Sequence, residues 1–176
     1  MTTAEDVRKR FNELLALLRA EHKSKIEALL LRHPLTIYVT DDEIRTHSRR
    51  DEVLWAATLQ GKLYFRLRTI PPRYADFVLL HEMMHMVVEE RDGVTPNSLE
   101  MDALSLQLLR GQGGLSRLQK IELEVKSLTT QEAERLEIDR PKNTTDDKML
   151  EMLLEVVTGR IKTSHSEAEV FNGLRG

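Results

Sequence analysis

The sequence predicts an α+β fold that combines several helices with a small antiparallel or mixed sheet. Apolar residues recur at helical spacing from about Ala4 to Arg32, and short β-branched and aromatic segments follow between residues 35 and 68. Helical spacing returns after Pro71-Pro72. Apolar residues make up 40% and charged residues 31% of the 176-residue chain, a balance typical of a folded domain rather than a disordered segment.

A long amphipathic helix is expected at the N-terminus, from about Ala4 to Arg32. Pro34 cannot continue this helix, and a residue that precedes proline is biased away from helical backbone, so the helix should end near Arg32. Its apolar residues, three or four positions apart, define one buried face. They are Val7, Phe11, Leu14, Leu15, Leu18, Ile26, Leu29 and Leu30.

The expected sheet comes from three segments. Leu35–Val39 is rich in β-branched and aromatic residues and ends at Asp41-Asp42. Glu52–Leu59 and Leu63–Leu67 flank a short turn and should form a β-hairpin, with Gly61 at the position that needs positive φ. Apolar and polar side chains alternate along the last segment, so one of its faces should be buried and the other polar.

The rest of the chain is expected to be helical. A helix over about Arg73–Glu90 should end at Asp92-Gly93. A glycine-rich break near residue 112 divides the chain into a first domain, 1–112, and a C-terminal helical extension, 113–176, packed on or beside it. The further helices cover about Leu99–Leu109, Ser116–Leu128, Gln131–Ile138 and Asp146–Ile161.

Composition narrows the classes of function. The net charge of −3 implies no general attraction for nucleic acid, so no nucleic-acid partner is expected. The absence of cysteine excludes thiolate zinc ligands, disulfides and a cysteine nucleophile. No signal-peptide-like segment and no apolar run of the ~18 residues needed to span a membrane is present. A cytoplasmic protein without membrane association is therefore expected.

The helix expected after Pro72 carries the pattern His81-Glu82-Met83-Met84-His85, or HExxH. Residues four apart on a helix lie one turn apart on the same face, so both imidazoles can point at one metal ion. Glu82 lies about 100° round the helix from His81, where it can reach a water on that ion. This arrangement is typical of zinc metallopeptidases, with His81 and His85 as ligands and Glu82 as the catalytic base.

Two observations favour a metal site over a helix that carries two histidines by chance. With 6 histidines in 176 residues, roughly 0.02 chance matches to the pattern are expected. The motif is also surrounded by apolar residues on nearly every side, as in a buried helix, and buried polar groups need partners such as a metal ion. The apolar neighbours are Phe77, Val78, Leu79, Leu80, Met83, Met84, Met86, Val87 and Val88.

A hairpin, an extended strand, a short break and a buried HExxH helix together resemble the zincin metallopeptidase fold. The resemblance covers about residues 35 to 110 and implies a zincin-like metallopeptidase domain within residues 1–112. It also implies that a peptide substrate pairs, as an added strand, with the strand before the motif helix. That strand would be Leu63–Arg68 or its neighbour.

The third metal ligand distinguishes the branches of the zincins. The metzincin pattern requires glycine at the position of Val88 and a ligand at the position of Arg91, so this branch is excluded. Glu100 begins the next expected helix, which is the gluzincin arrangement, and is the expected third ligand. Asp102 and Asp92 are the reserve candidates. Asp102 lies about 200° round the helix from Glu100, so the two carboxylates do not readily share one ion.

Two metallopeptidase families have local patterns that resemble segments of this chain. Glu100-Met101-Asp102-Ala103 is similar to the E-x-x-A helix of ImmA/IrrE-type metallopeptidases. This resemblance implies cleavage of a regulatory protein, such as a repressor, in a bacterium or mobile element. Pro71–Met86 is similar to the SprT-like group, a weaker match because no histidine follows the motif before His165.

The expected function is a zinc-dependent endopeptidase that acts on a protein or peptide substrate. Zinc would lower the pKa of its water to near 7, and Glu82 would take the proton before attack on the peptide carbonyl. The alternative is a non-catalytic protein-binding or regulatory module on a zincin scaffold. Retention of Glu82 favours the enzyme, because a dead site need not keep its base. The residue that stabilises the oxyanion stays open among Arg73, Tyr74, Tyr64, His47 and His165.

Overall fold

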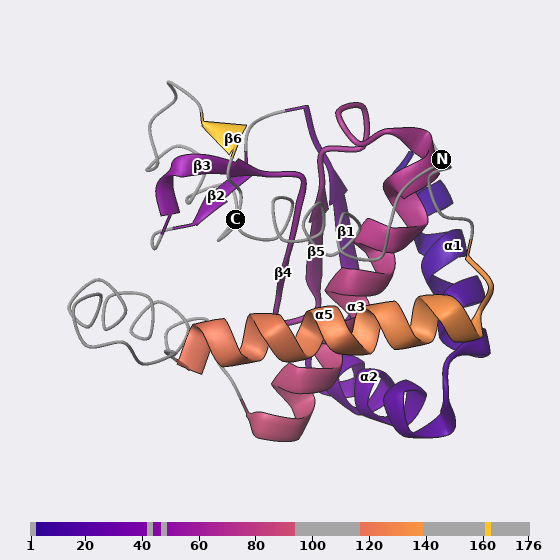
Figure 1. The fold of residues 1–176 in the computed structure, drawn as a ribbon. Helices are drawn as coiled ribbons and strands as arrows, with labels where there is room; N and C mark the ends of the chain where they lie inside the picture. Colours follow the sequence, from indigo (N-terminus) through magenta and orange to yellow (C-terminus); the bar gives the residue numbers. More distant parts are fainter. Residues whose placement is uncertain (1–2, 42–43, 47–48, 94–116, 139–160, 163–176) are drawn as a thin grey trace.

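The computed structural model describes residues 3–41, 44–46, 49–93, 117–138 and 161–162, and these residues form the predicted α+β fold (Figure 1). The helices are α1 (Ala4–Leu17), α2 (Ala20–Arg32), α3 (Ala75–Asp92) and α5 (Arg117–Arg135), and a 3-10 turn, Pro72–Tyr74, leads into α3. The strands are β1 (Thr36–Val39), β2 (Ile44–Thr46), β3 (Arg49–Leu54), β4 (Ala56–Leu59), β5 (Lys62–Phe65) and β6 (Ile161–Lys162).

The single N-terminal helix predicted from Ala4 to Arg32 is wrong, because the segment forms two helices. Leu18 and Arg19, between α1 and α2, have extended backbone with ψ of 158° and 145°. No large apolar side chain occurs between Leu18 and Ile26, so a straight helix would have no reason to stay on the core through this stretch. The bend brings the apolar faces of both helices onto the same core. α2 ends at Arg32, before Pro34, as predicted.

A mixed three-stranded sheet, in the order β1-β5-β4, contains the predicted hairpin. β4 and β5 are antiparallel, and Gln60 and Gly61 between them have φ of 46° and 78°. β1 runs parallel to β5, which makes β5 the central strand. The prediction that one face of β5 is polar is wrong for Tyr64, which is buried. The strand register places Tyr38 opposite Tyr64, and the two rings stack with centroids 4.8 Å apart.

The strand predicted from Glu52 to Leu59 is divided between two sheets. β3 pairs with β2 and β6 in an antiparallel sheet, and Trp55 separates it from β4. The Trp55 carbonyl still accepts a hydrogen bond from the Arg66 amide at 2.9 Å. No glycine or proline marks the division, so sequence patterning gave no sign of it. The end of the predicted helix Asp146–Ile161 falls in β6, and the rest of that helix lies outside the described residues.

Gly61 is required both by its backbone and by its surroundings. A Cβ added there would lie 2.2 Å from the carbonyl oxygen of His33, and Gly93, at the end of α3, has a similar φ of 63° but nothing within 4 Å. Gly61→Ala is therefore expected to lower the free energy of unfolding by at least about 2 kcal/mol, and Gly93→Ala by only about 1 kcal/mol. Urea unfolding of both variants measures this difference. Equal losses of unfolding free energy would show that the contact with the His33 carbonyl oxygen adds nothing to the cost of the Gly61 substitution.

The motif helix α3 is buried on every side, as its apolar sequence predicts. α1, α2, α5 and β4 all contact it, and α5 crosses in front of it in Figure 1. Arg10 of α1 binds the carboxylate of Asp76 with two hydrogen bonds, of 2.9 and 2.8 Å, at the first turn of α3. Arg32 of α2 pairs with Glu90 near its last turn. Ion pairs near both ends thus link α3 to α1 and α2.

The two helices predicted over Ser116–Leu128 and Gln131–Ile138 are instead one helix, α5. Thr129, at the predicted break, donates its hydroxyl to the carbonyl oxygen of Val125 at 2.6 Å and stays helical. The apolar side of α5 belongs to the same hydrophobic core as α3, and this packing outweighs the weak helix propensity of threonine. The proposed domain division at residue 112 lies outside the described residues and stays a prediction.

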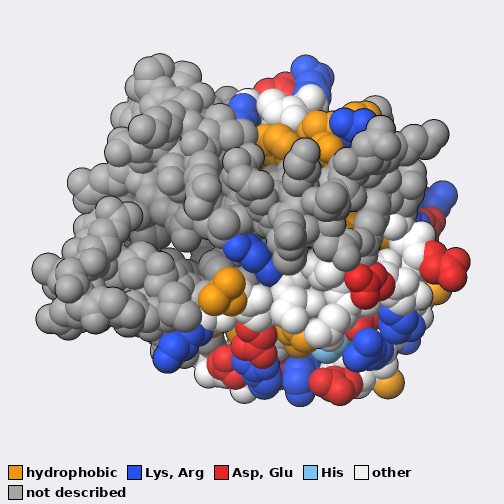
Figure 2. Space-filling view, in the orientation of Figure 1, with side chains coloured by type: hydrophobic (Ala, Val, Ile, Leu, Met, Phe, Trp, Pro, Cys, Tyr) orange, Lys and Arg blue, Asp and Glu red, His pale blue; other side chains and the backbone are white. Residues whose placement is uncertain are grey.

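The surface of the described residues carries both signs of charge. Figure 2 shows acidic and basic side chains interspersed on the exposed lower part of the face in view, rather than gathered by sign. Charged side chains also form ion pairs between elements, such as Arg91 of α3 with Glu124 of α5. Among the described helices, none combines the length and the apolar character needed to cross a membrane.

Candidate functional site

The structure places the three motif residues in the middle of α3, at the centre of the core. His81 and Glu82 are 1% and 3% exposed, and His85 is half-buried. The two imidazole rings are neighbours, with centroids 4.9 Å apart and planes at 75° to each other. The predicted juxtaposition of His81 and His85 on one face of the helix is therefore present.

Glu82 is held by a side chain of the sheet. The hydroxyl of Thr58, on β4, donates a hydrogen bond of 2.6 Å to Oε2 of Glu82. A hydrogen bond this short to a carboxylate is typical of a charge-assisted contact. It orients the carboxylate of Glu82. β4 and α3 thus meet at the motif glutamate.

His81 lies against α5. Its Nδ1 is 3.3 Å from the hydroxyl oxygen of Thr129. Burial lowers the pKa of His81 well below its ordinary value of 6.5, and the nearby His85 and Lys126 lower it further. The ring is therefore neutral at pH 7, and neutral imidazole is the form of histidine that binds a metal ion.

The carboxylates predicted as third ligand are not brought to the histidines within the described residues. Glu100 and Asp102 lie outside those residues. Asp92 pairs with Arg91 at the end of α3, about 10 Å along the helix from His85. Among the described residues, no group of three or more histidine, cysteine, aspartate or glutamate side chains is arranged to hold a metal ion. The described part of the site therefore offers an imidazole pair as metal donors, and a third donor has to come from elsewhere.

Glu89 is a further carboxylate on the motif helix, one turn after His85. Burial raises its pKa to about 7 from 4.5, although His85 and Arg32 act in the opposite direction. A carboxyl group with this environment is half ionised near neutral pH. The sequence alone did not single out Glu89, because no local pattern distinguishes it from an ordinary surface glutamate near the end of a helix.

The candidates for an oxyanion donor have other contacts in the structure. Tyr64 stacks on Tyr38, and Arg73 lies over the ring of Tyr74, with its guanidinium carbon 5.0 Å from the centroid. His47 and His165 lie outside the described residues. A cation that the sequence did not single out, Lys126 of α5, is buried near His81 instead.

Sequence reasoning missed Thr58, Thr129 and Lys126, which surround the motif. They come from a strand 23 residues before His81 and from a helix more than 40 residues after it. Threonine and lysine are common surface residues, and nothing in their local pattern shows that they point inward. The only usable signal was indirect, because buried polar residues on α3 require partners on the elements that cover it.

Comparison with known proteins identified no relative of the chain. The chain matches no protein-family model, no curated protein and no solved structure. The function has to be inferred from the residues of the site and their contacts.

Proposed function

We propose that the chain is a zinc-dependent endopeptidase of the zincin type. The observation that carries the proposal is the pair of adjacent imidazoles, His81 and His85, beside a buried Glu82 that is oriented by Thr58. These are the side chains that the HExxH motif contributes to a metallopeptidase, in a buried setting where electrostatic interactions are strong. Zinc would be held by His81 and His85, with Glu100 as the proposed third ligand.

The roles of the side chains follow from their chemistry. Bound zinc would polarise the scissile carbonyl and make a water more acidic. Glu82 accepts a proton from the attacking water and can later deliver it to the leaving amine. Thr58 aligns the Glu82 carboxylate through Oε2. His81, neutral because it is buried, is ready to act as a donor without first losing a proton.

The sheet indicates where a peptide would lie. β5 is the central strand of its sheet, so Leu63–Arg68 is less suited than its neighbour to accept an added strand. β1 and β4 are the edge strands of this sheet, and of the two, β4 contacts α3 more extensively and carries Thr58, which binds Glu82. We place the substrate backbone along β4, where its carbonyl groups would pass near Glu82. A protein substrate with an extended segment suits this mode of binding.

Thr58→Val keeps the shape of the side chain but removes the hydroxyl that binds Glu82. Because a hydrogen bond to a charged group contributes about 1.5–3 kcal/mol, kcat is expected to fall at least roughly 10-fold. Thr58→Ser retains the hydroxyl and should keep most of the activity. Steady-state kinetics of the two zinc-loaded variants on one peptide make the comparison. Equal activity in Thr58→Val and the wild type would remove Thr58 from the mechanism.

The metal content of the purified protein tests the first half of the proposal. Native mass spectrometry should show one zinc ion per chain, and removal with a chelator should abolish peptidase activity. Restored activity on addition of zinc completes the test. A protein that retains no zinc in the presence of excess metal would refute the proposal.

A further inference from the structure

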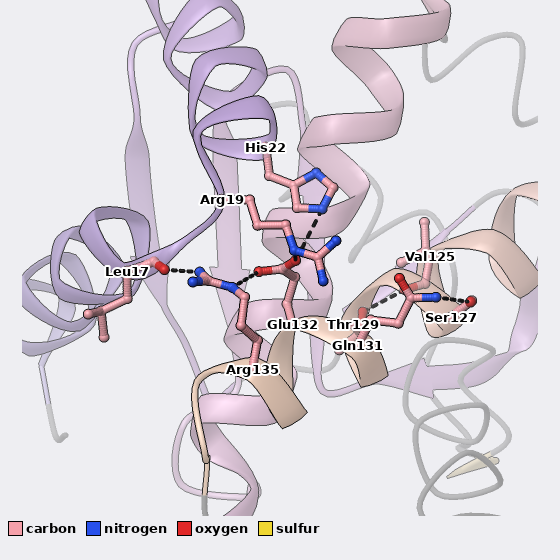
Figure 3. A network of polar contacts seen from close by, with 9 residues as sticks. All are labelled: Leu17, Arg19, His22, Val125, Ser127, Thr129, Gln131, Glu132 and Arg135. Carbon is pink, nitrogen blue, oxygen red and sulfur yellow. Dashed lines mark hydrogen bonds and ion pairs between the residues drawn. The ribbon is translucent and has the colours of Figure 1, made fainter.

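α5 is fixed against α2 and α3 at two places. Toward its beginning, Glu124 pairs with Arg91 of α3. Toward its end, the carboxylate of Glu132 is fully buried and lies within 2.9–3.3 Å of basic groups from α5 and from the start of α2 (Figure 3). A buried carboxylate is stable only when such partners are in place, so these contacts set the position of α5. The partners of Glu132 are Arg19, His22 and Arg135.

Thr129 lies between these two anchors and is completely buried. Its Oγ1 is 2.6 Å from the carbonyl oxygen of Val125 and 3.3 Å from Nδ1 of His81. A hydroxyl has one proton to donate, and a carbonyl oxygen can only accept. In the short contact, the Thr129 hydroxyl therefore donates its hydrogen to the carbonyl oxygen of Val125. Toward His81 the Thr129 oxygen is an acceptor, so Nδ1 of His81 has to carry the hydrogen.

The position of this hydrogen decides which nitrogen of His81 can bind a metal ion. A neutral imidazole has a single N–H, so a hydrogen on Nδ1 gives Nε2 the lone pair that a ligand requires. We propose that Thr129 is a positioning residue that holds His81 as the Nδ1–H tautomer and thereby presents Nε2 to zinc. The zinc part of this inference rests on the proposed function. The tautomer part rests on the contacts of Thr129 alone.

A purely structural role for Thr129 makes a different prediction. The hydroxyl of a threonine in a helix often donates a hydrogen bond to the carbonyl oxygen four residues earlier. This hydrogen bond affects only the helix that contains it. In that case removal of the hydroxyl would change stability but leave the His81 ring unaffected. Thr129→Val removes the hydroxyl at nearly constant volume, and Thr129→Ser keeps it. The two variants therefore separate the roles.

The experiment uses the full chain, labelled with ¹⁵N in its histidine rings and free of metal. Two-bond ¹H–¹⁵N spectra identify the protonated nitrogen of each ring, and a His81→Gln variant assigns the signals. His81 should be the Nδ1–H tautomer in the wild type and in Thr129→Ser, and should lose this preference in Thr129→Val. Zinc affinity, measured by competition with a chromophoric chelator, should fall roughly 10–100-fold in Thr129→Val and recover in Thr129→Ser.

Each failure has a distinct meaning. An Nε2–H tautomer of His81 in the wild type would overturn the inference, even if Thr129→Val did not fold. Unchanged tautomer and unchanged zinc affinity in a folded Thr129→Val would also overturn it, while the peptidase proposal would stand. If the wild type bound no zinc at all, the proposed function would fail, and the tautomer would still test the contact between Thr129 and His81.

Discussion

Replacing Glu82 with glutamine is expected to lower peptidase activity by roughly 10²–10⁴-fold, the usual effect of losing a general base. Glutamine keeps the size of the side chain and can still accept the hydrogen bond from Thr58. It cannot take a proton at neutral pH. Because Glu82 is not proposed as a ligand, zinc content and the free energy of unfolding should stay close to those of the wild type. kcat on a peptide substrate and metal analysis of the same sample measure both effects.

Glu90→Gln provides a matched control on the same helix. Glu90 lies about two turns beyond Glu82 and pairs with Arg32, away from Thr58 and the motif histidines. Its loss removes an ion pair near the surface, away from the reacting groups, and should leave kcat within about a factor of two, because exposed ion pairs contribute little to stability. Full activity in Glu82→Gln would show that another group accepts the proton.

Replacing His85 with alanine is expected to remove zinc and, with it, all measurable peptidase activity. A site that keeps only one of its two imidazoles loses most of its affinity for the ion. The variant should still fold, because His85 is half-buried and its ring contributes less to the core than the methionines around it. Zinc titration followed by native mass spectrometry gives the stoichiometry, and circular dichroism checks the fold.

His33→Ala is the corresponding control, since it removes a half-buried histidine at the end of α2. It should retain one zinc ion per chain. The contrast between Glu82→Gln and His85→Ala is informative, because the first should separate activity from metal content and the second should abolish both. Normal zinc binding by a folded His85→Ala would place the metal site elsewhere in the chain.

Local sequence signals predicted much of the fold. Pro34, the turn at Gly61 and the apolar residues around the motif correctly indicated the end of α2, the hairpin and a buried helix. The bend at Leu18 and the change of sheet at Trp55 were missed. Both are places where the chain changes direction to remain on the core without glycine or proline, so only the three-dimensional packing shows them.

The site was predictable only as far as its residues lie on one helix. Helical spacing fixes the relation of His81, Glu82 and His85, and the structure has this relation. The contacts of Thr58 and Thr129 depend on how β4 and α5 pack against α3, which is a long-range property without a local pattern. Glu100 lies outside the described residues, so its role as third ligand stays a prediction.

Mapping of new N-termini in a lysate of the source cells tests the peptidase function most directly. Zinc-loaded wild-type protein should generate a small set of new termini that disappear on chelation, return with zinc and are missing with Glu82→Gln. The flanking sequences should fit an extended segment, as pairing with β4 requires. A wild-type protein that binds one zinc ion and yet produces no new termini would contradict a peptidase and favour a protein-binding module that retains the metal site.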